Sequence, residues 1–319
     1  MPFNPTVDID ALRAGNRRAL ARAITLVESQ NPAHRPAANA LLDSLMPYTG
    51  TSTRLGISGV PGVGKSTFIE TFGLRAIERG QRVAVLAVDP SSPVNGGSIL
   101  GDKTRMESLS RADGAFIRPS PAGDSLGGVA QRTREAILLC EAAGYDQVWV
   151  ETVGVGQSEH AVANMTDAFM VLMQPGAGDE LQGIKKGILE LADFIVVNKA
   201  DGDATLLAEA SRRHYQNAVN LLTHNGFWQP QVLSISAVTF NGLDTLEGQL
   251  QDYLRLGSKS LAARRTGQNL SWLEEQLRTL AWQAITQDPD AVTRYQRARE
   301  AVMNGTMAPI PAAMSVLQP

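Results

Sequence analysis

Gly59-Val-Pro-Gly-Val-Gly-Lys-Ser66 fits the pattern G-x-x-x-x-G-K-S/T, in which glycines let successive backbone N–H groups turn inward around phosphate oxygens. The stretch follows the apolar run Arg54–Ser58 and precedes Thr67–Glu78, which has helical character. In this context Lys65 would bring a positive charge to the β and γ phosphates, and Ser66 a hydroxyl to Mg²⁺. The predicted phosphate-binding residues are Gly59, Val60, Pro61, Gly62, Val63, Gly64, Lys65, Ser66 and Thr67.

Strand-like apolar runs alternate with helical stretches from residue 54 to about residue 255. Runs that are apolar on both faces and separated by helices indicate a mostly parallel sheet covered by helices on both faces. The predicted fold class is therefore an α/β P-loop NTPase, with helical N-terminal and C-terminal extensions. The runs are Arg54–Ser58, Arg82–Val88, Ala115–Arg118, Gln147–Glu151, Ala168–Met173, Asp193–Asn198 and Gln231–Ile235.

The chain is expected to have three parts: a helical region at 1–50, a nucleotide-binding P-loop domain at 51–256 and a helical arm at 257–319. Asn16 is a predicted N-cap in the first part, and Asp288 followed by proline is another in the arm. The arm could pack on its own domain or against a second subunit, and its sequence leaves both open.

A second motif predicts the choice of base. Asn198-Lys-Ala-Asp201 fits N-K-x-D and follows the run Phe194–Val197. A carboxylate at Asp201 can accept hydrogen bonds from N1–H and the 2-amino group of guanine. Adenine would leave this carboxylate unpaired, at a cost of at least about 1–3 kcal/mol. We therefore expect GTP rather than ATP, with the base contacted by Asn198, Lys199, Asp201, Ser236, Ala237 and Val238.

Acidic residues follow two of the predicted strands. Asp89 and Glu151 each end an apolar run, and Asp102 lies in a glycine-rich stretch. A carboxylate at a strand tip beside a phosphate loop is typical of a Mg²⁺ site. With Ser66, these three residues are the predicted metal ligands, although each acid could instead be a solvated side chain or a helix cap.

The segment Glu151-Thr-Val-Gly154 occupies the place of the D-x-x-G motif of small GTPases. Gly154 would donate its N–H to the γ-phosphate, so this loop is expected to respond to hydrolysis. The glutamine that often orients the attacking water is absent, because Val155 is the next residue. We therefore expect slow intrinsic hydrolysis unless a partner or another loop completes the site.

Composition excludes several classes of protein. The formal net charge is −3 and no run of Lys or Arg reaches five, so a broad nucleic-acid surface is not expected. No apolar run approaches the roughly 20 residues of a membrane span. Cys140 is the only cysteine and is expected to be a packed core thiol. The four histidines are scattered and form no recognisable metal site with the single cysteine, which disfavours a metallochaperone. His160 is expected to be a polar surface residue. A cytoplasmic location is predicted.

Several longer motifs resemble the MeaB/MMAA family of GTPases, chaperones of adenosylcobalamin-dependent acyl-CoA mutases, chiefly methylmalonyl-CoA mutase. The same family carries the older label ArgK, or LAO/AO transport ATPase. The resemblance covers nearly the whole chain and implies GTP, GDP and Mg²⁺ as ligands. It is carried by Gly59–Thr67, Asp89-Pro-Ser-Ser, Gly97–Met106, Glu151–Glu159 and Gln174–Gly187.

The resemblance also implies partners. A homodimer would form largely through the arm, and the chain would gate cofactor delivery to the mutase and protect it from inactivation. Relatives use the loop corresponding to Gln174–Gly187 as a switch that contacts the mutase, which makes Lys185 a candidate for a catalytic positive charge; alternatively, Lys185 and Lys186 form a solvated helix face. The alternative functions are a GTP-dependent metallochaperone, a regulator of transport or of a kinase, and an enzyme of metabolic phosphoryl transfer.

Overall fold

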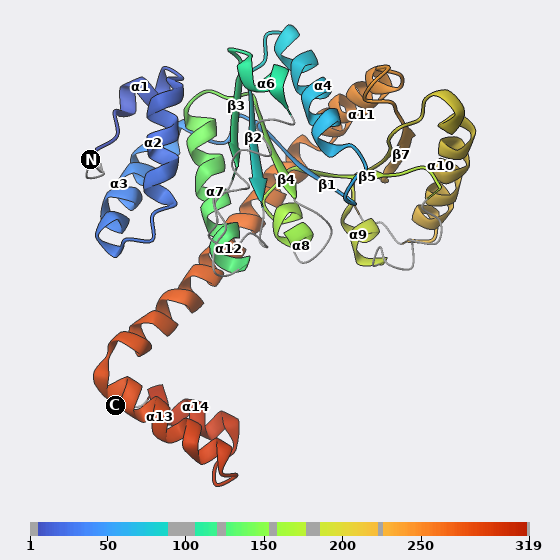
Figure 1. Cartoon of the computed structure of the whole chain (residues 1–319). Coiled ribbons are helices and arrows are strands. Elements are labelled where there is room, and N and C mark those ends of the chain that lie inside the picture. Colours follow the sequence, from blue (N-terminus) through green and yellow to red (C-terminus); the bar gives the residue numbers. More distant parts are fainter. Residues whose placement is uncertain are drawn as a thin grey trace. The chain divides into compact units, whose positions relative to one another are not determined.

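The computed structural model describes residues 6–88, 106–119, 126–152, 158–176, 186–222 and 226–317 (Figure 1). The chain divides into two compact units, Met1–Ala262 and Ala263–Pro319. The boundary lies inside the long helix α12 (Ser258–Gln287), and the N-terminal helices belong to the first unit.

A seven-stranded sheet with every strand parallel forms the centre of the first unit, in the order β3-β2-β4-β1-β5-β6-β7. All seven predicted strands are present, with bounds within about two residues of the expected ones. They are β1 (Thr53–Gly59), β2 (Val83–Val88), β3 (Ala115–Pro119), β4 (Gln147–Thr152), β5 (Ala168–Met173), β6 (Phe194–Val197) and β7 (Gln231–Ser234).

Side chains alternate along these strands between two hydrophobic cores, one on each face of the sheet. In β4, Trp149 belongs to one core and its neighbours Val148 and Val150 to the other. The Trp149 face is covered by α4 (Lys65–Glu78), α6 (Glu107–Arg111) and α11 (Leu243–Leu256). The opposite face is covered by α2 (Arg17–Val27), α3 (Arg35–Leu45), α7 (Leu126–Ala142), α8 (Ser158–Ala163), α9 (Lys186–Leu191) and α10 (Thr205–Asn220). The predicted α/β fold class is confirmed.

The N-terminal helices pack on α7. Asn16 caps α2, accepting from the N–H groups of Arg18 and Ala19 as its sequence predicted. Two ion pairs tie the helices to the rest of the unit, Glu28 with Arg118 in β3 and Arg35 with Glu135 in α7. The other short elements among the described residues of this unit are α1 (Ile9–Arg13), η1 (Pro32–His34), η2 (Met46–Tyr48) and η4 (Gly202–Ala204).

In the second unit, α12 is followed by α13 (Pro289–Met303) and α14 (Pro309–Leu317). Asp288 caps α13 by accepting from Asp290 N–H, as predicted. A small core of Ala298, Ala312 and Val316, with Ile285 and Tyr295 against it, holds the two last helices together.

Two further expectations concern single residues. Cys140 is fully buried in α7, and burial raises the pKa of its thiol, so it is the packed core thiol that was expected. His160 is exposed on α8. Among the described residues, no helix combines the length and the apolar character that crossing a membrane requires.

Candidate nucleotide-binding site

The predicted phosphate loop joins β1 to α4 directly. Gly59, Gly62 and Gly64 adopt positive φ angles of 152°, 78° and 92°, a region that side chains disfavour. Space also requires glycine, because a Cβ at Gly59 would lie 2.5 Å from the carbonyl oxygen of Leu172. The sequence pattern therefore matches a backbone conformation that other residues would strain.

Lys65 lies at the first position of α4 and folds back over the loop. Its Nζ donates to the carbonyl oxygen of Gly59 at 2.7 Å and to that of Val60 at 3.4 Å. The ammonium group is thus held by the loop itself, at the positive end of a helix macrodipole. Both effects favour an anion such as a phosphate group at this place.

The predicted base loop after β6 is bound to the phosphate loop by two side chains. Asn198 is buried and donates from Nδ2 to the carbonyl oxygen of Val63 at 2.9 Å, while its Oδ1 accepts from Ala237 N–H at 3.2 Å. Lys199 donates from Nζ to the carbonyl oxygen of Gly62 at 2.6 Å and has a φ of 62°. Residues separated by more than 130 positions in sequence therefore meet in one place.

The Asp201 carboxylate is oriented by a hydroxyl. Ser236 donates to Asp201 Oδ2, and its own oxygen accepts from Val238 N–H at 3.3 Å and Thr239 N–H at 3.0 Å. Ser236 thus holds both the Asp201 carboxylate and the backbone of the loop after β7. Val238 is 70% exposed, so this edge of the site is open to a ligand.

Thr71 was not predicted from the sequence, yet it belongs to this network. From the second turn of α4 its Oγ1 donates to the carbonyl oxygen of Ala237 at 2.9 Å. No motif includes this position, and a threonine inside a helix gives no sequence signal for such a contact.

Two of the four predicted metal ligands, Ser66 and Glu151, lie within the described residues. Ser66 lies in the first turn of α4, and Glu151 is 5% exposed near the end of β4. By alternation along the strand, Glu151 lies on the same face as Trp149, whose ring stacks on Phe72 of α4 at 5.5 Å. The strand therefore places Glu151 on the side of the sheet that carries α4. Asp89, Asp102, Gly154 and Lys185 lie outside the described residues.

A second unpredicted contact joins the strands that carry these motifs. Thr152 donates from Oγ1 to Ser58 Oγ at 2.8 Å, and both side chains are fully buried. The ends of β4 and β1 are thereby connected next to the phosphate loop. Within the part of the chain that the structure describes, no group of three or more His, Cys, Asp or Glu residues is arranged to hold a metal ion.

Comparison with known proteins gives relatives over nearly the whole chain. Residues 20–290 match the family described as methylmalonyl Co-A mutase-associated GTPase MeaB. GTPase ArgK of Escherichia coli is 49% identical over 304 residues, covering 94% of this chain and 92% of the relative. The mouse protein named methylmalonic aciduria type A homolog, mitochondrial, is 43% identical and covers 95% of this chain and 76% of its own.

A solved structure is similar to this chain in both sequence and fold. The crystal structure described as LAO/AO transport system kinase is 42% identical, with a TM-score of 0.77, and covers 97% of this chain and 94% of that chain. The similarity extends over both units of the chain described above.

Proposed function

Because this chain belongs to the MeaB family of methylmalonyl-CoA mutase-associated GTPases, we propose that it is a Mg²⁺-dependent GTPase serving as chaperone of an adenosylcobalamin-dependent acyl-CoA mutase. In this role GTP binding and hydrolysis gate cofactor loading and protect the mutase. The observation that supports nucleotide binding best is the junction of the two loops, where Asn198 and Lys199 hold the carbonyl oxygens of Val63 and Gly62.

The residues of the junction have separate roles in this proposal. Backbone groups of 59–67 surround the phosphates, and Lys65 neutralises their charge. Asp201 accepts from the guanine edge, and Ser236 keeps its carboxylate turned toward the base. Ala237 and Val238 line the same edge of the site, because Ser236 Oγ holds the backbone that follows it.

The described donors suit Mg²⁺, which prefers hard oxygen ligands and keeps several waters. Ser66 supplies a hydroxyl at the start of α4, and Glu151 a carboxylate on the same side of the sheet. Asp89 and Asp102 complete the proposed set from outside the described residues. When bound, the ion would neutralise charge on the β and γ phosphates.

We expect slow hydrolysis by the chain alone. The segment that begins at Glu151 has no water-orienting glutamine after Gly154, whose N–H is the proposed γ-phosphate donor. A positive charge delivered on partner binding would supply the missing stabilisation, and Lys185 is the proposed source.

Assembly and location complete the proposal. The chain forms a homodimer through the arm at 257–319, and residues 51–256 form the nucleotide-binding domain. A stripe of leucines on α12 supports the dimer, since Leu270, Leu273, Leu277 and Leu280 are each more than half exposed. The protein acts in the cytoplasm, where its single thiol stays reduced.

The decisive experiment is a pull-down of purified methylmalonyl-CoA mutase by the full chain, loaded with GDP or a non-hydrolysable GTP analogue. We expect nucleotide-dependent capture and a GTPase rate that rises when mutase is added. Capture that is absent in both nucleotide states would overturn the chaperone role and favour the transport or kinase regulator. Lys65→Ala, which removes the positive charge that faces the phosphates, serves as the catalytic control.

Lys185→Ala tests the source of stimulation separately. If Lys185 stabilises the transition state, the variant should bind mutase as the natural chain does and lose most of the stimulated rate. The expected loss is about 2–4 kcal/mol in the stimulated barrier. Equal stimulation of both proteins, with mutase binding measured in the same assay, would assign this role elsewhere.

A further inference from the structure

The strand β3 forms one outer edge of the sheet, and part of its backbone faces away from its neighbour β2. Val83 N–H donates to the carbonyl oxygen of Gly114 at 2.9 Å, so Gly114 faces β2. Backbone groups alternate along a parallel strand, which directs those of Phe116 toward β2 and those of Ala115 and Ile117 outward. Ala115 N–H donates to the carbonyl oxygen of Ala112 at 3.1 Å. The outer edge therefore presents the N–H of Ile117 and the carbonyl oxygens of Ala115 and Ile117.

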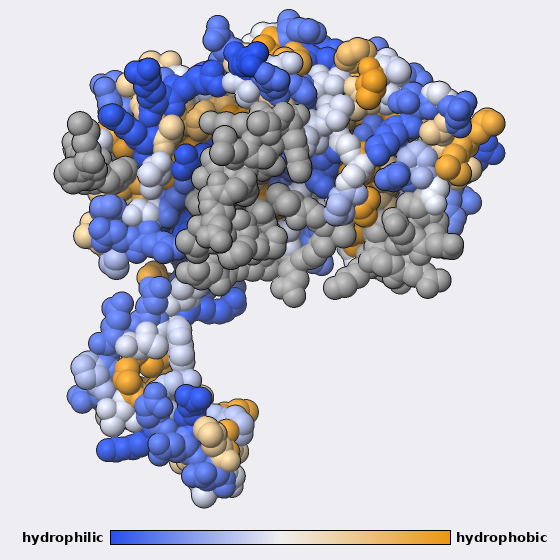
Figure 2. Space-filling view, in the orientation of Figure 1, coloured by the Kyte–Doolittle hydropathy of each residue, from blue (hydrophilic) through white to orange (hydrophobic). Residues whose placement is uncertain are grey.

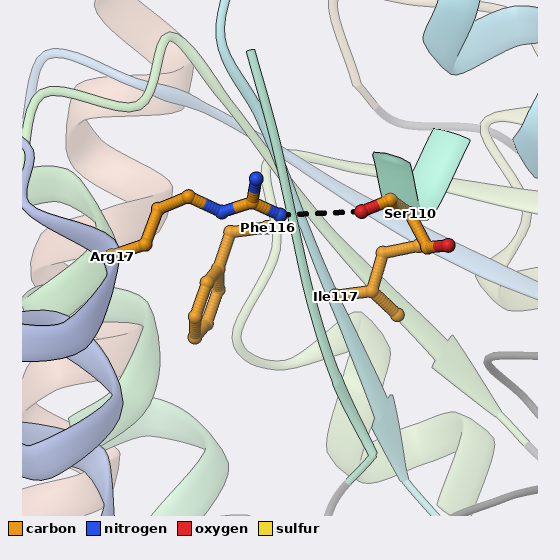
Figure 3. Close-up of a pocket in the computed structure, with 4 residues that line it drawn as sticks. All are labelled: Arg17, Ser110, Phe116 and Ile117. Atoms are coloured by element: carbon orange, nitrogen blue, oxygen red, sulfur yellow. Dashed lines mark hydrogen bonds between the residues drawn. The ribbon is translucent and has the colours of Figure 1, made fainter. Parts of the chain in front are cut away.

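A hollow of about 310 Å³ lies at this edge, lined by Arg17, Ser110, Phe116 and Ile117 (Figure 3). Its volume is at the lower end of the range for ligand pockets, roughly 300–1,000 Å³. Phe116 and Ile117 point to opposite sides of the strand and belong to the two separate cores. Arg17 extends from the first turn of α2 toward Ser110 of α6, so its guanidinium connects α2 to the helix that precedes β3.

Arg17 has more hydrogen-bonding capacity than its surroundings use. Its Nη2 donates to the carbonyl oxygen of Ser110 at 3.3 Å, a long bond to a neutral acceptor. Among the described residues, no carboxylate lies within ion-pair distance of this side chain, although a guanidinium has five N–H donors. The exposed neighbours Arg18 and Arg22 add further positive charge to the same helix. Within the described residues, the hollow thus offers a charged donor, a strand edge with outward-facing backbone groups and two apolar side chains, and it contains no acidic group.

We propose that the outer edge of β3 binds an extended segment of another protein, which pairs its backbone with Ile117 and places a carboxylate side chain on Arg17. Addition of a strand to an exposed sheet edge is a general mode of peptide recognition, with main-chain bonds giving affinity and side chains specificity. Pro119 has no N–H and ends the edge, so the paired segment is short.

A second copy of this chain fits the edge poorly. The strand Ala115–Pro119 contains no acidic residue, so edge-to-edge pairing would bring two Arg17 side chains together with no carboxylate from either strand. The edge is also separate from the proposed nucleotide site. That site lies in loops that follow β1, β6 and β7, whereas Ser110 precedes β3 and Phe116 and Ile117 lie in the middle of the strand. The proposal is therefore independent of the function proposed above.

The probe for the test is a fluorescein-labelled peptide amide, Thr-Val-Glu-Val-Thr, titrated with the full chain and followed by fluorescence anisotropy. We expect saturable binding with a dissociation constant below about 1 mM. Arg17→Ala should weaken it about tenfold, since a charge-assisted hydrogen bond is lost. The matched control Arg18→Ala, on the same helix but outside the hollow, should bind within about twofold of the natural chain. Glutamine in place of the glutamate should weaken binding to the natural chain and have no further effect on Arg17→Ala.

A second measurement tests the strand pairing. Hydrogen exchange at the Ile117 amide should slow when the peptide is present, and N-methylation of the peptide backbone should abolish binding. The proposal is overturned if no saturable binding is found, or if Arg17→Ala and Arg18→Ala bind alike. It is also overturned if N-acetylglutamate amide binds as tightly as the peptide, because the site would then take a free carboxylate without any strand.

Discussion

Thr71 in α4 donates a hydrogen bond of 2.9 Å from Oγ1 to the carbonyl oxygen of Ala237, in the loop after β7. The N–H of Ala237 donates to Asn198 Oδ1, and Asn198 Nδ2 donates to the carbonyl oxygen of Val63. Since Val63 leads directly into α4 through Gly64, these contacts form a closed ring. Helix α4, which follows the predicted phosphate loop, therefore positions the loop that we assign to the base.

Thr71→Val removes the hydroxyl and keeps the shape of the side chain. The carbonyl oxygen of Ala237 then loses the hydrogen bond from Thr71. A bond of this kind contributes about 0.5–1.5 kcal/mol. We expect GDP and GTP to bind roughly 2- to 10-fold more weakly by isothermal titration calorimetry. Thr71→Ser keeps the donor and should bind like the natural chain. If the valine and serine variants have equal affinity, this bond does not position the base loop.

Asp201→Asn tests the choice of base. An amide can donate to the carbonyl group at C2 of xanthine, but it has only one acceptor oxygen, so its NH2 group would face one of the two guanine donors. We therefore expect GTP affinity to fall more than tenfold and XTP affinity to rise, since a buried polar mismatch costs about 1–3 kcal/mol. Calorimetry with GTP and with XTP measures both changes in affinity. Unchanged GTP affinity would remove Asp201 from the base site.

Much of the fold follows from local sequence signals. The runs that became β2 and β5 are uniformly apolar because both faces of the sheet are covered, and their ends are marked by glycine, proline or acidic residues. The caps at Asn16 and Asp288 were predictable for the same reason, since they depend on a side chain and the N–H groups two or three residues away.

The contacts that were missed depend on distant parts of the chain. Thr71 and Ala237 are 166 residues apart, and Thr152 and Ser58 are 94 apart. Their pairing is decided by strand order, which periodicity does not encode. The edge position of β3 has the same origin, so local sequence signals do not predict the hollow beside Arg17.

Glu151→Gln examines the proposed metal site. The change replaces a buried carboxyl group with an amide of similar volume, so the sheet should remain folded, which urea unfolding can verify. If Glu151 holds Mg²⁺ directly or through water, half-maximal GTP hydrolysis should need roughly tenfold more Mg²⁺. An unchanged Mg²⁺ titration would leave Asp89 and Asp102 as the acidic ligands.

Glu28 gives stability a specific pH dependence. Burial raises the pKa of its carboxyl above the ordinary 4.5, and the hydrogen bond from Arg118 offsets this only in part. A group with a raised pKa binds its proton more tightly in the folded state, so the free energy of unfolding falls as pH rises from 4.5 through the raised value. Glu28→Gln does not titrate. Urea unfolding at pH values from about 4 to about 7 should therefore show the variant gaining stability relative to the natural chain as pH rises. If the difference in free energy of unfolding between the two proteins stays constant or changes in the opposite direction as pH rises, Glu28 does not have a raised pKa in the folded state.

The arm offers the last test, because four of its exposed leucines recur along one helix. Leu270, Leu273, Leu277 and Leu280 are spaced by three, four and three residues along α12, the pattern of helices that pack through a continuous seam. Their exposures lie between 55% and 58% in the single chain. Figure 2 also shows apolar patches on the arm among hydrophilic residues. Full burial of one leucine side chain contributes about 1.5–3 kcal/mol, so several leucines together can stabilise a dimer.

Leu273→Glu combined with Leu277→Glu should therefore give a monomer at micromolar concentration by light scattering, because two charges would have to be buried in the seam. Arg278→Ala is the matched control: Arg278 is exposed on the same helix and pairs with Glu274, so the dimer should persist. A chain that ends at Ala262, the last residue of the first unit, should also be monomeric and still bind GDP, since the contacts of the nucleotide site lie within that unit. If the double variant remains dimeric while the shortened chain does not, another face of the arm forms the interface. If both remain dimeric, the interface lies on the nucleotide-binding unit.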